Sequence, residues 1–154
     1  MGLSYHLFQT RRLIYVRLTG PVGLADIFRL YSVLERDKAF RPGSAELIDF
    51  AGLSDLDLSY NDMRTLRLRE RDYYTRTPNP VLCVIHAPSD TNFGMARMYQ
   101  QLVATTGDHV VEIARDEAEA LAMLNQPEAS FSSLLADPEC APEQPAPNLG
   151  LTST

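Results

Sequence analysis

The chain has few cysteines, and this scarcity limits the kinds of protein it can be. Its 154 residues include two, Cys83 within an apolar segment and Cys140 among prolines. Two cysteines in such different surroundings make neither the disulfide framework of a small secreted domain nor a cysteine-rich metal cluster. We expect both to be free thiols.

A surplus of basic charge and a long apolar run are also missing. Acidic residues outnumber basic ones by 20 to 14, which gives a net charge of −6, whereas a protein that binds the phosphate backbone needs a basic face. Nucleic acid is therefore not an expected partner. The segment 1–20 contains Arg11, Arg12 and Arg17 and no apolar run long enough for a signal peptide or a membrane span. We expect a soluble, cytoplasmic protein without stable membrane insertion.

No motif for a cofactor or a metal is present. No glycine-rich phosphate-binding loop follows any predicted strand, and the segment GPVG at 20–23 lacks both the spacing and the lysine of such a loop. The histidines His6, His86 and His109 fall on different predicted strands, so they do not indicate a metal site. The sequence thus predicts neither a cofactor nor a metal ion.

What the chain does have is the size and composition of one compact domain. With 45% apolar and 22% charged residues, it can bury a sizeable core. After Gln126 the composition changes, because half of the 10 prolines lie there among small and acidic residues without sustained periodicity. We therefore predict one domain over 1–126 and a disordered, proline-rich tail over 127–154.

The apolar periodicity alternates between strand and helix. Two β-type runs come first and can form a hairpin, and four βα units follow from the second run onward. Strands are predicted over 5–9, 13–19, 45–50, 81–86 and 109–114, and helices over about 24–37, 59–77, 90–107 and 117–126. This order predicts an α/β domain with a mostly parallel, five-stranded sheet.

Alternation within the strands predicts that helices cover mainly one face of this sheet. Ile14 and Val16 point to one side and Tyr15 and Arg17 to the other, and Glu112 interrupts the fifth strand in the same manner. A parallel sheet covered on both faces has continuous apolar strands instead. We expect an incompletely covered face, and a symmetric homodimer that uses this face or an adjacent edge.

The segment after the third strand is the most informative part of the chain. The buried strand ends at Asp49, and a polar loop then leads to Ser59 at the start of a long helix. Ser54, Asp55 and Asp57 are thereby placed at the carboxyl edge of the sheet, where open α/β folds bind their ligands. These five residues form a candidate phosphorylation site or partner-binding edge.

The same segment carries a resemblance to a known family. The β-β-α-β-α-β-α-β-α order, DFAGLSDLDLS at 49–59 and GMARMY at 94–99 resemble the SpoIIAA-like bacterial family, relatives of the STAS domains of anti-sigma-factor antagonists. The resemblance covers about residues 5–125, which is the size of an ordinary domain. It implies a SpoIIAA-like, STAS-type fold.

The resemblance also implies a role. In the antagonists a partner kinase phosphorylates the serine that corresponds to Ser59; Asp49, Gly52 and Asp57 match other motif positions, whereas Leu58 replaces the first serine of the pair. The implied function is a non-catalytic regulatory or protein-interaction module, with a regulator or kinase as partner and a degenerate phospho-switch at Ser59. The alternative is a small-molecule or lipid carrier, because this branch is often grouped in name with lipid-binding SEC14 domains.

Structural explanations exist for Ser59 and for a stripe of arginines on the helix that follows it. Ser59 is a good N-cap for the second helix, a role that Ser, Thr, Asp and Asn all fill. Arg64, Arg67 and Arg71 share one stripe of that helix and could grip an anionic partner, but interleaved acidic residues favour a solvated face with local ion pairs.

A second candidate site lies where the third helix begins. Asn92, Gly94 and Arg97 accompany a loop whose helix-start amides can receive an anion or another ligand. Arg97 can equally anchor that loop internally.

Catalysis would need converging groups, and Ser59, His86 and Asp49 are the candidates for nucleophile, base and orienting acid. No sharp strand-to-helix elbow of the Gly-x-Ser-x-Gly type surrounds the serine. We therefore predict no catalytic residues.

Overall fold

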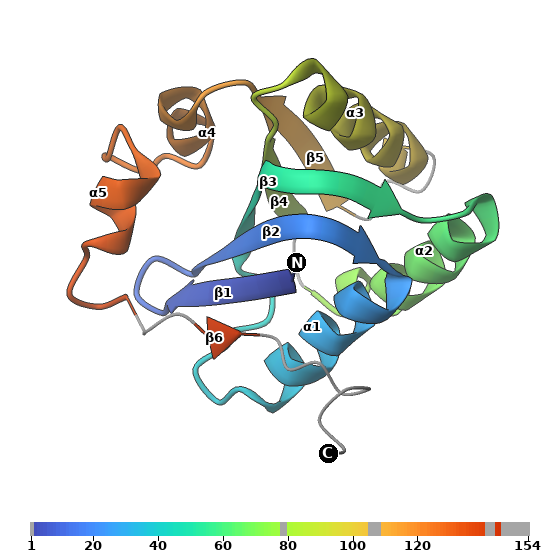
Figure 1. Ribbon diagram of the computed structural model, residues 1–154. Helices are drawn as coiled ribbons and strands as arrows, with labels where there is room; N and C mark the ends of the chain where they lie inside the picture. Colours follow the sequence, from blue (N-terminus) through green and yellow to red (C-terminus); the bar gives the residue numbers. More distant parts are fainter. Residues whose placement is uncertain (1, 78–79, 105–108, 141–143, 146–154) are drawn as a thin grey trace, which may run out of the picture.

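A twisted sheet with helices on both faces forms the frame of the molecule (Figure 1). The computed structural model describes residues 2–77, 80–104, 109–140 and 144–145. The strands are β1 (Gly2–Phe8), β2 (Leu13–Gly23), β3 (Ala45–Asp57), β4 (Val81–His86), β5 (His109–Ala114) and β6 (Gln144–Pro145). The helices are α1 (Leu24–Arg36), α2 (Tyr60–Tyr74), α3 (Asp90–Ala104), α4 (Glu117–Met123) and α5 (Phe131–Leu135).

The strand order confirms the α/β class and a mostly parallel sheet. Across the sheet the strands run β5-β4-β3-β2-β1-β6. Neighbours from β2 to β5 are parallel, while β1 is antiparallel to both β2 and β6. The five predicted strands are all present, and the two-residue β6 extends the edge at β1.

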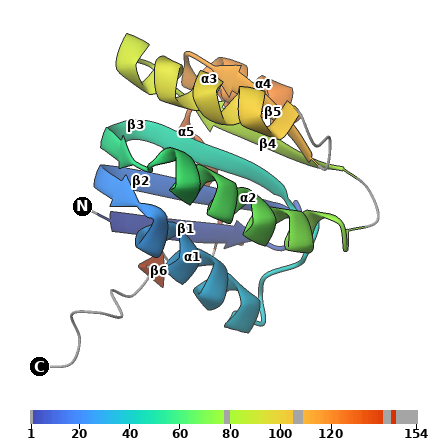
Figure 2. The same ribbon diagram turned by 90° about the vertical axis from the view of Figure 1, so that its right-hand side faces the viewer.

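The helices are divided unequally between the two faces of the sheet. α1, α2 and α3 lie on one face, and the short α4 and α5 lie on the other (Figures 1 and 2). Because successive strand residues point to opposite faces, Val16 and Ile85 pack in the core under the three long helices, while Leu47 and Val84 pack in a second core under α4 and α5. The helices are therefore mainly on one face, as the alternation predicts.

The prediction of an incompletely covered second face is wrong at its central residue. Tyr15 is 1% exposed, because the segment after α4 returns to the sheet and places Phe131 edge-on to the tyrosine ring, with centroids 5.4 Å apart. Arg17 is half-buried, and Glu112 is exposed. The homodimer expected from this face remains untested, and less apolar surface is left for it to bury.

The predicted disordered tail is also wrong for residues 127–140, which fold onto the domain. Ser130 caps α5 by accepting a hydrogen bond from the Ser133 amide at 3.1 Å, and Phe131 and Leu134 are buried at 4% and 0% exposure. A five-residue helix with two core side chains is too short to produce a recognisable periodicity. The remainder of the predicted tail lies outside the described residues, apart from β6.

Arg11, in the turn between β1 and β2, fastens this segment to the sheet. Its guanidinium donates to both carboxylate oxygens of Glu128 at 2.7 Å, to Gln126 Oε1 at 2.9 Å and to Asp137 Oδ2 at 3.0 Å. Arginine matches a carboxylate in this two-pronged way because its donors form a planar fork. The turn and the α5 segment are thus held together across 115 to 126 positions of sequence.

β3 is longer than the sequence indicates, so the polar loop predicted before Ser59 is mostly strand. It continues to Asp57 because β2 also continues, through Gly20 and Pro21, and pairs with it in parallel. The two strands approach closely at Gly52, where a Cβ atom would stand 3.1 Å from the Thr19 methyl group and 3.2 Å from a backbone oxygen. A side chain at position 52 would therefore require β2 to shift slightly at Leu18 and Thr19.

Candidate functional site

A cavity lies between α1, α2 and the central strands of the sheet. One part has a volume of about 100 Å³, and a second part, nearer the carboxyl end of α1, has about 80 Å³. The two parts share five lining residues, which are Val16, Leu30, Tyr31, Glu46 and Ile48. We treat them as one cavity, called here the α1–α2 cavity.

The depth of the polar groups shows that this space extends from the surface into the interior. Tyr31, Glu46 and Tyr99 are enclosed by protein deeply enough for burial to be the main influence on the pKa of each. Each nevertheless keeps some accessible surface, as does Ile48 in the first part of β3. Side chains that are deep yet accessible face a cavity, and all four line this one.

Glu46 is the carboxylate that both parts of the cavity share. The Tyr74 hydroxyl donates to it, at 2.8 Å from each carboxylate oxygen, and the Cys83 thiol donates a further bond. Burial raises the pKa of Glu46 to about 7, assisted by the negative charge of Glu70 and opposed by these two hydrogen bonds. Glu46 is therefore close to its titration midpoint at neutral pH.

Glu70, on α2, accepts hydrogen bonds from more donors than the hydroxyl and thiol that reach Glu46. It accepts hydrogen bonds from the hydroxyls of Tyr31 at 2.8 Å and Tyr99 at 2.5 Å, and from Arg67 Nη1 at 3.2 Å. Burial still raises the pKa of Glu70, against the lowering effect of all three donors. This carboxylate has one cationic partner and two neutral ones.

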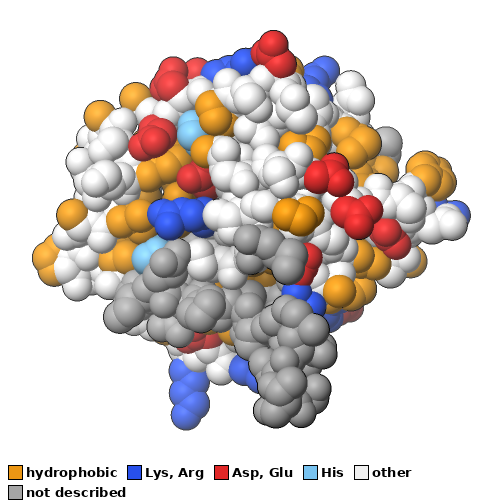
Figure 3. Space-filling view, in the orientation of Figure 1, with side chains coloured by type: hydrophobic (Ala, Val, Ile, Leu, Met, Phe, Trp, Pro, Cys, Tyr) orange, Lys and Arg blue, Asp and Glu red, His pale blue; other side chains and the backbone are white. Residues whose placement is uncertain are grey.

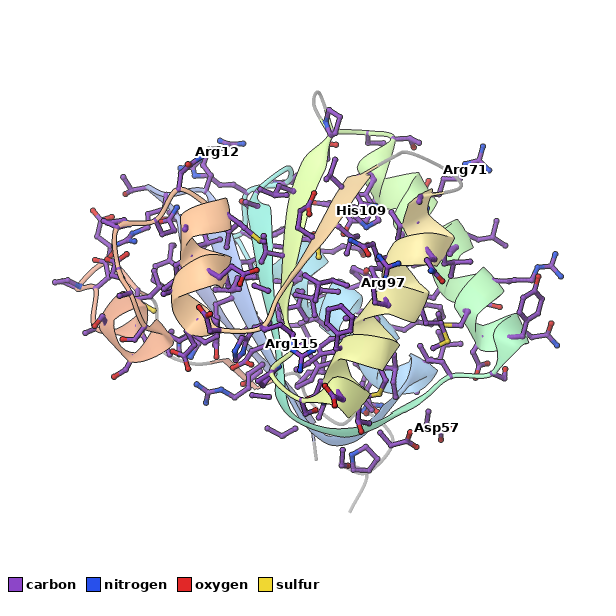
Figure 4. All side chains as sticks on the ribbon, turned by 90° about the horizontal axis from the view of Figure 1, so that it is seen from above. Arg12, Asp57, Arg71, Arg97, His109 and Arg115 are labelled. Atoms are coloured by element: carbon purple, nitrogen blue, oxygen red, sulfur yellow. The ribbon has the colours of Figure 1, made fainter. Side chains whose placement is uncertain are left out.

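His109 completes the polar cluster from β5. Its ring stacks on Tyr74 with centroids 3.9 Å apart, and its Nε2 lies 3.1 Å from the Tyr99 hydroxyl. Since that hydroxyl donates its hydrogen to Glu70, it accepts from His109, which places a hydrogen on Nε2. Figure 4 shows His109 between α3 and the sheet. The cluster therefore joins α1, α2, α3, β3 and β5.

The residues predicted for a phosphorylation site or partner edge lie outside this cavity. Ser54, Asp55 and Asp57 are exposed on the extension of β3, and acidic side chains gather over this end of the sheet in Figure 3. Figure 4 shows Asp57 at one end of α2 and Arg71 projecting at the other. The structure thus places an acidic surface next to the start of α2.

Ser59 acts as the N-cap of α2. Its hydroxyl accepts from the Asp62 amide at 3.0 Å, and the Asp62 carboxylate accepts from the Ser59 amide at 3.0 Å. This reciprocal pair satisfies two backbone donors that a helix start otherwise leaves open. The structural explanation of Ser59 is confirmed, and its phosphorylation remains a prediction.

Asp49, grouped with Ser59 by the sequence, belongs to a separate buried network on the α4–α5 face. Asp49 accepts from the Tyr15 hydroxyl at 2.7 Å and lies 2.9 Å from Nδ1 of His86. Its pKa is lowered by the bonds from His86, the Ala51 amide and Tyr15, which together outweigh burial. Eight strand residues separate it from the end of β3, or about 26 Å at 3.3 Å per residue. From the sequence we consider Ser59, His86 and Asp49 as a catalytic group and do not predict one, and the structure does not bring Ser59 to the other two.

The candidate anion loop is the first part of a helix. α3 begins at Asp90, and Ser89 caps it by accepting from the Asn92 amide at 3.0 Å. The Asn92 side chain is buried and donates to the Leu53 carbonyl at 3.1 Å, whereas Arg97 donates to Gln100 at 2.7 Å. Gly94 is exposed. These contacts tie α3 to β3 and leave the three residues apart.

The stripe of three arginines on α2 is also divided by the fold. Arg67 is buried and pairs with Glu70, while Arg64 and Arg71 are exposed. The expected solvated face is therefore wrong at Arg67, whose ion pair with Glu70 is local but buried, and the three arginines do not form a single anion-binding surface.

The polar cluster was not predicted from the sequence, although the positions of its tyrosines could be. Tyr31, Tyr74 and Tyr99 fall at core positions of their helices, and tyrosine hydroxyls find partners when they are buried. The partners, Glu46 and Glu70, come from a strand and a helix, and nothing in the local sequence shows that they meet.

Comparison with protein-family models, curated proteins and solved structures finds no match. Within the described ranges, no group of three or more His, Cys, Asp or Glu side chains could hold a metal ion. The helices of those ranges include none that is both long and apolar enough to cross a membrane.

Proposed function

We propose that this protein is a small-molecule-binding domain whose ligand occupies the α1–α2 cavity. The observation that supports this most is the accessible surface retained by Glu46 and Ile48, in the first part of a central strand and under a layer of helices. Protein interiors are otherwise filled to crystal-like density. A cavity lined mainly by apolar side chains, with a few convergent polar groups, is the usual form of a ligand site.

The size of the cavity limits the ligand to a small one. An apolar cavity of about 150 Å³ binds benzene, and the two parts here have about 100 and 80 Å³ with shared walls. The ligand is thus the size of one aromatic ring with a short substituent. A whole lipid chain does not fit, which narrows the carrier role to small molecules.

Toluene provides the direct test, because it matches the size and carries no polar group. We expect NMR titration to shift the methyl resonances of Ile48, Leu30 and Leu66, which line the cavity. Ile48→Phe, which extends a side chain into the cavity, should weaken the binding. The matched control is Leu68→Phe, since Leu68 is 69% exposed on α2.

The toluene titration of the wild-type protein tests the proposed function even if Ile48→Phe does not fold. Toluene shifts confined to surface methyl groups, or no shifts at all, would contradict the proposed function.

The regulatory role implied by the SpoIIAA-like resemblance is a second candidate. It is favoured by one observation, that Ser59 and Asp62 cap α2, which also forms a wall of the cavity. Ligand binding and a partner at the Ser59 edge would then act on the same helix.

A further inference from the structure

We propose that the α1–α2 cavity selects a ligand with a protonated nitrogen, and that Glu46 is its ion-pair partner. This inference rests on the proposed function, because it names the chemical class of the ligand for the same cavity. It follows from the charges and hydrogen bonds that face the cavity.

The charges around the cavity do not balance. Glu46 and Glu70 can each carry a negative charge. In the described part of the chain, one cationic side chain contacts this pair, which is Arg67, and it is bonded to Glu70. At the other end Arg69 and Glu35 pair with each other at 2.6 Å and so contribute no net charge. One negative charge in the interior is left for a proton or for a cation to neutralise.

Glu46 is the carboxylate that carries this unbalanced charge. Its two donors, the Tyr74 hydroxyl and the Cys83 thiol, are neutral, and a carboxylate can accept about four hydrogen bonds. Glu46 also lines both parts of the cavity. It therefore has both the free acceptor capacity and the position to receive a donor from the ligand.

The other groups near Glu46 favour a ligand whose polar group is a cation over one whose polar group is an anion or a neutral hydroxyl. Tyr31 from α1, Tyr99 from α3 and His109 from β5 add hydroxyls and a ring but no carboxylate, and Glu70 from α2 adds a second negative charge. A carboxylate or phosphate ligand would stand beside two like charges, which is unfavourable at low dielectric. A neutral alcohol would leave an ionised Glu46 uncompensated. An ammonium group replaces the proton that Glu46 otherwise holds.

Three probes that share one ring and differ in the end group test this inference. Benzylamine, benzyl alcohol and benzoate are titrated at pH 8, where Glu46 with a pKa of about 7 is mostly ionised. We expect benzylamine to bind about tenfold more tightly than benzyl alcohol, as suits a charge-assisted hydrogen bond. Benzoate should bind more weakly than either.

Variants identify the residue responsible. Glu46→Gln should abolish the preference for benzylamine while benzyl alcohol still binds, and Glu112→Gln, at an exposed position of β5 outside the lining of the cavity, should keep it. Calorimetry at pH 6.5 in buffers of different ionisation enthalpy should show proton release when benzylamine binds the wild-type protein. Glu46→Gln should show no such release.

The inference and the proposed function fail in different ways. Equal affinities of the wild-type protein for benzylamine and benzyl alcohol, or an amine preference that survives in Glu46→Gln, would overturn the inference alone. If neither these probes nor toluene bind in the cavity, the proposed function itself is wrong. If Glu46→Gln does not fold, the affinities of the wild-type protein and its proton release still test the inference.

Discussion

Removing the α5 segment should strongly destabilise the domain, contrary to what its proline-rich composition suggests. Truncation after Gln126 deletes Phe131 and Leu134, which are 4% and 0% exposed, and two carboxylates that bind Arg11. It also uncovers Tyr15 and His86, whose rings lie 5.4 and 5.0 Å from the Phe131 ring.

The magnitude can be worked out from one residue. Truncating a buried phenylalanine to alanine costs about 3 to 5 kcal/mol, because a cavity remains where the ring packed. For a domain of this size, about 1 kcal/mol shifts the melting temperature by roughly 2 to 4 °C. Phe131→Ala should therefore lower the melting temperature by about 6 °C or more, and truncation after Gln126 by more than that.

Thermal unfolding followed by circular dichroism, together with urea titration, measures both variants. Ser132→Ala is the matched control, since Ser132 is exposed on the same short helix and such substitutions stay within about 0.5 kcal/mol. A truncated protein that melts within about 2 °C of the full chain would show that α5 does not pack on the sheet.

The further predictions concern two residues, Glu46 and Ser59. Because burial raises the pKa of Glu46 from 4.5 to about 7 in the folded protein, its ionisation should destabilise the fold by up to about 3 kcal/mol as the pH rises through that window. Glu46→Gln should remove this loss between pH 5 and pH 8 in urea titrations, whereas Glu112→Gln, at an exposed position outside the cavity, should not; equal pH dependence in the three proteins would refute this prediction. Ser59→Ala should cost about 1 kcal/mol and Ser59→Asn almost nothing, as expected for an N-cap. If Ser59 is also a phospho-switch, the Ser59→Asp variant should lose binding partners in pull-downs, and the Ser59→Asn variant should retain them. Recovery of the same partners by both variants would show that Ser59 acts only as a helix cap.

The sequence allows the layout of the sheet to be predicted because its local patterns are strong. Residues 81–86 are apolar almost throughout and 13–19 alternate, so each run indicates a strand without any knowledge of its neighbours. The extension of β3 could not be predicted in this way, since Ser54, Asp55 and Asp57 have low strand propensity. They are in a strand because β2 lies alongside them.

The candidate site could be predicted less well, for a physical reason. A cavity is a property of how far apart two elements lie, and sequence patterns report which residues face inward, not how completely the space between them is filled. Glu46 looks like one polar residue in a strand, and Glu70 and Arg67 look like a helical ion pair. Their importance arises when α2 brings Tyr74 and Glu70 over β3.

The Arg11 contacts have a consequence for how this protein is made. Arg11 leaves the ribosome before its partners at 126, 128 and 137, which follow more than 110 residues later. Until they arrive, Leu47, Val84 and Tyr15 lack the cover that Phe131 and Leu134 give them on the α4–α5 face, and contacts of such long range form slowly. The nascent chain therefore carries a partly uncovered apolar sheet face until the α5 segment has been made, which is the stage at which aggregation competes with folding.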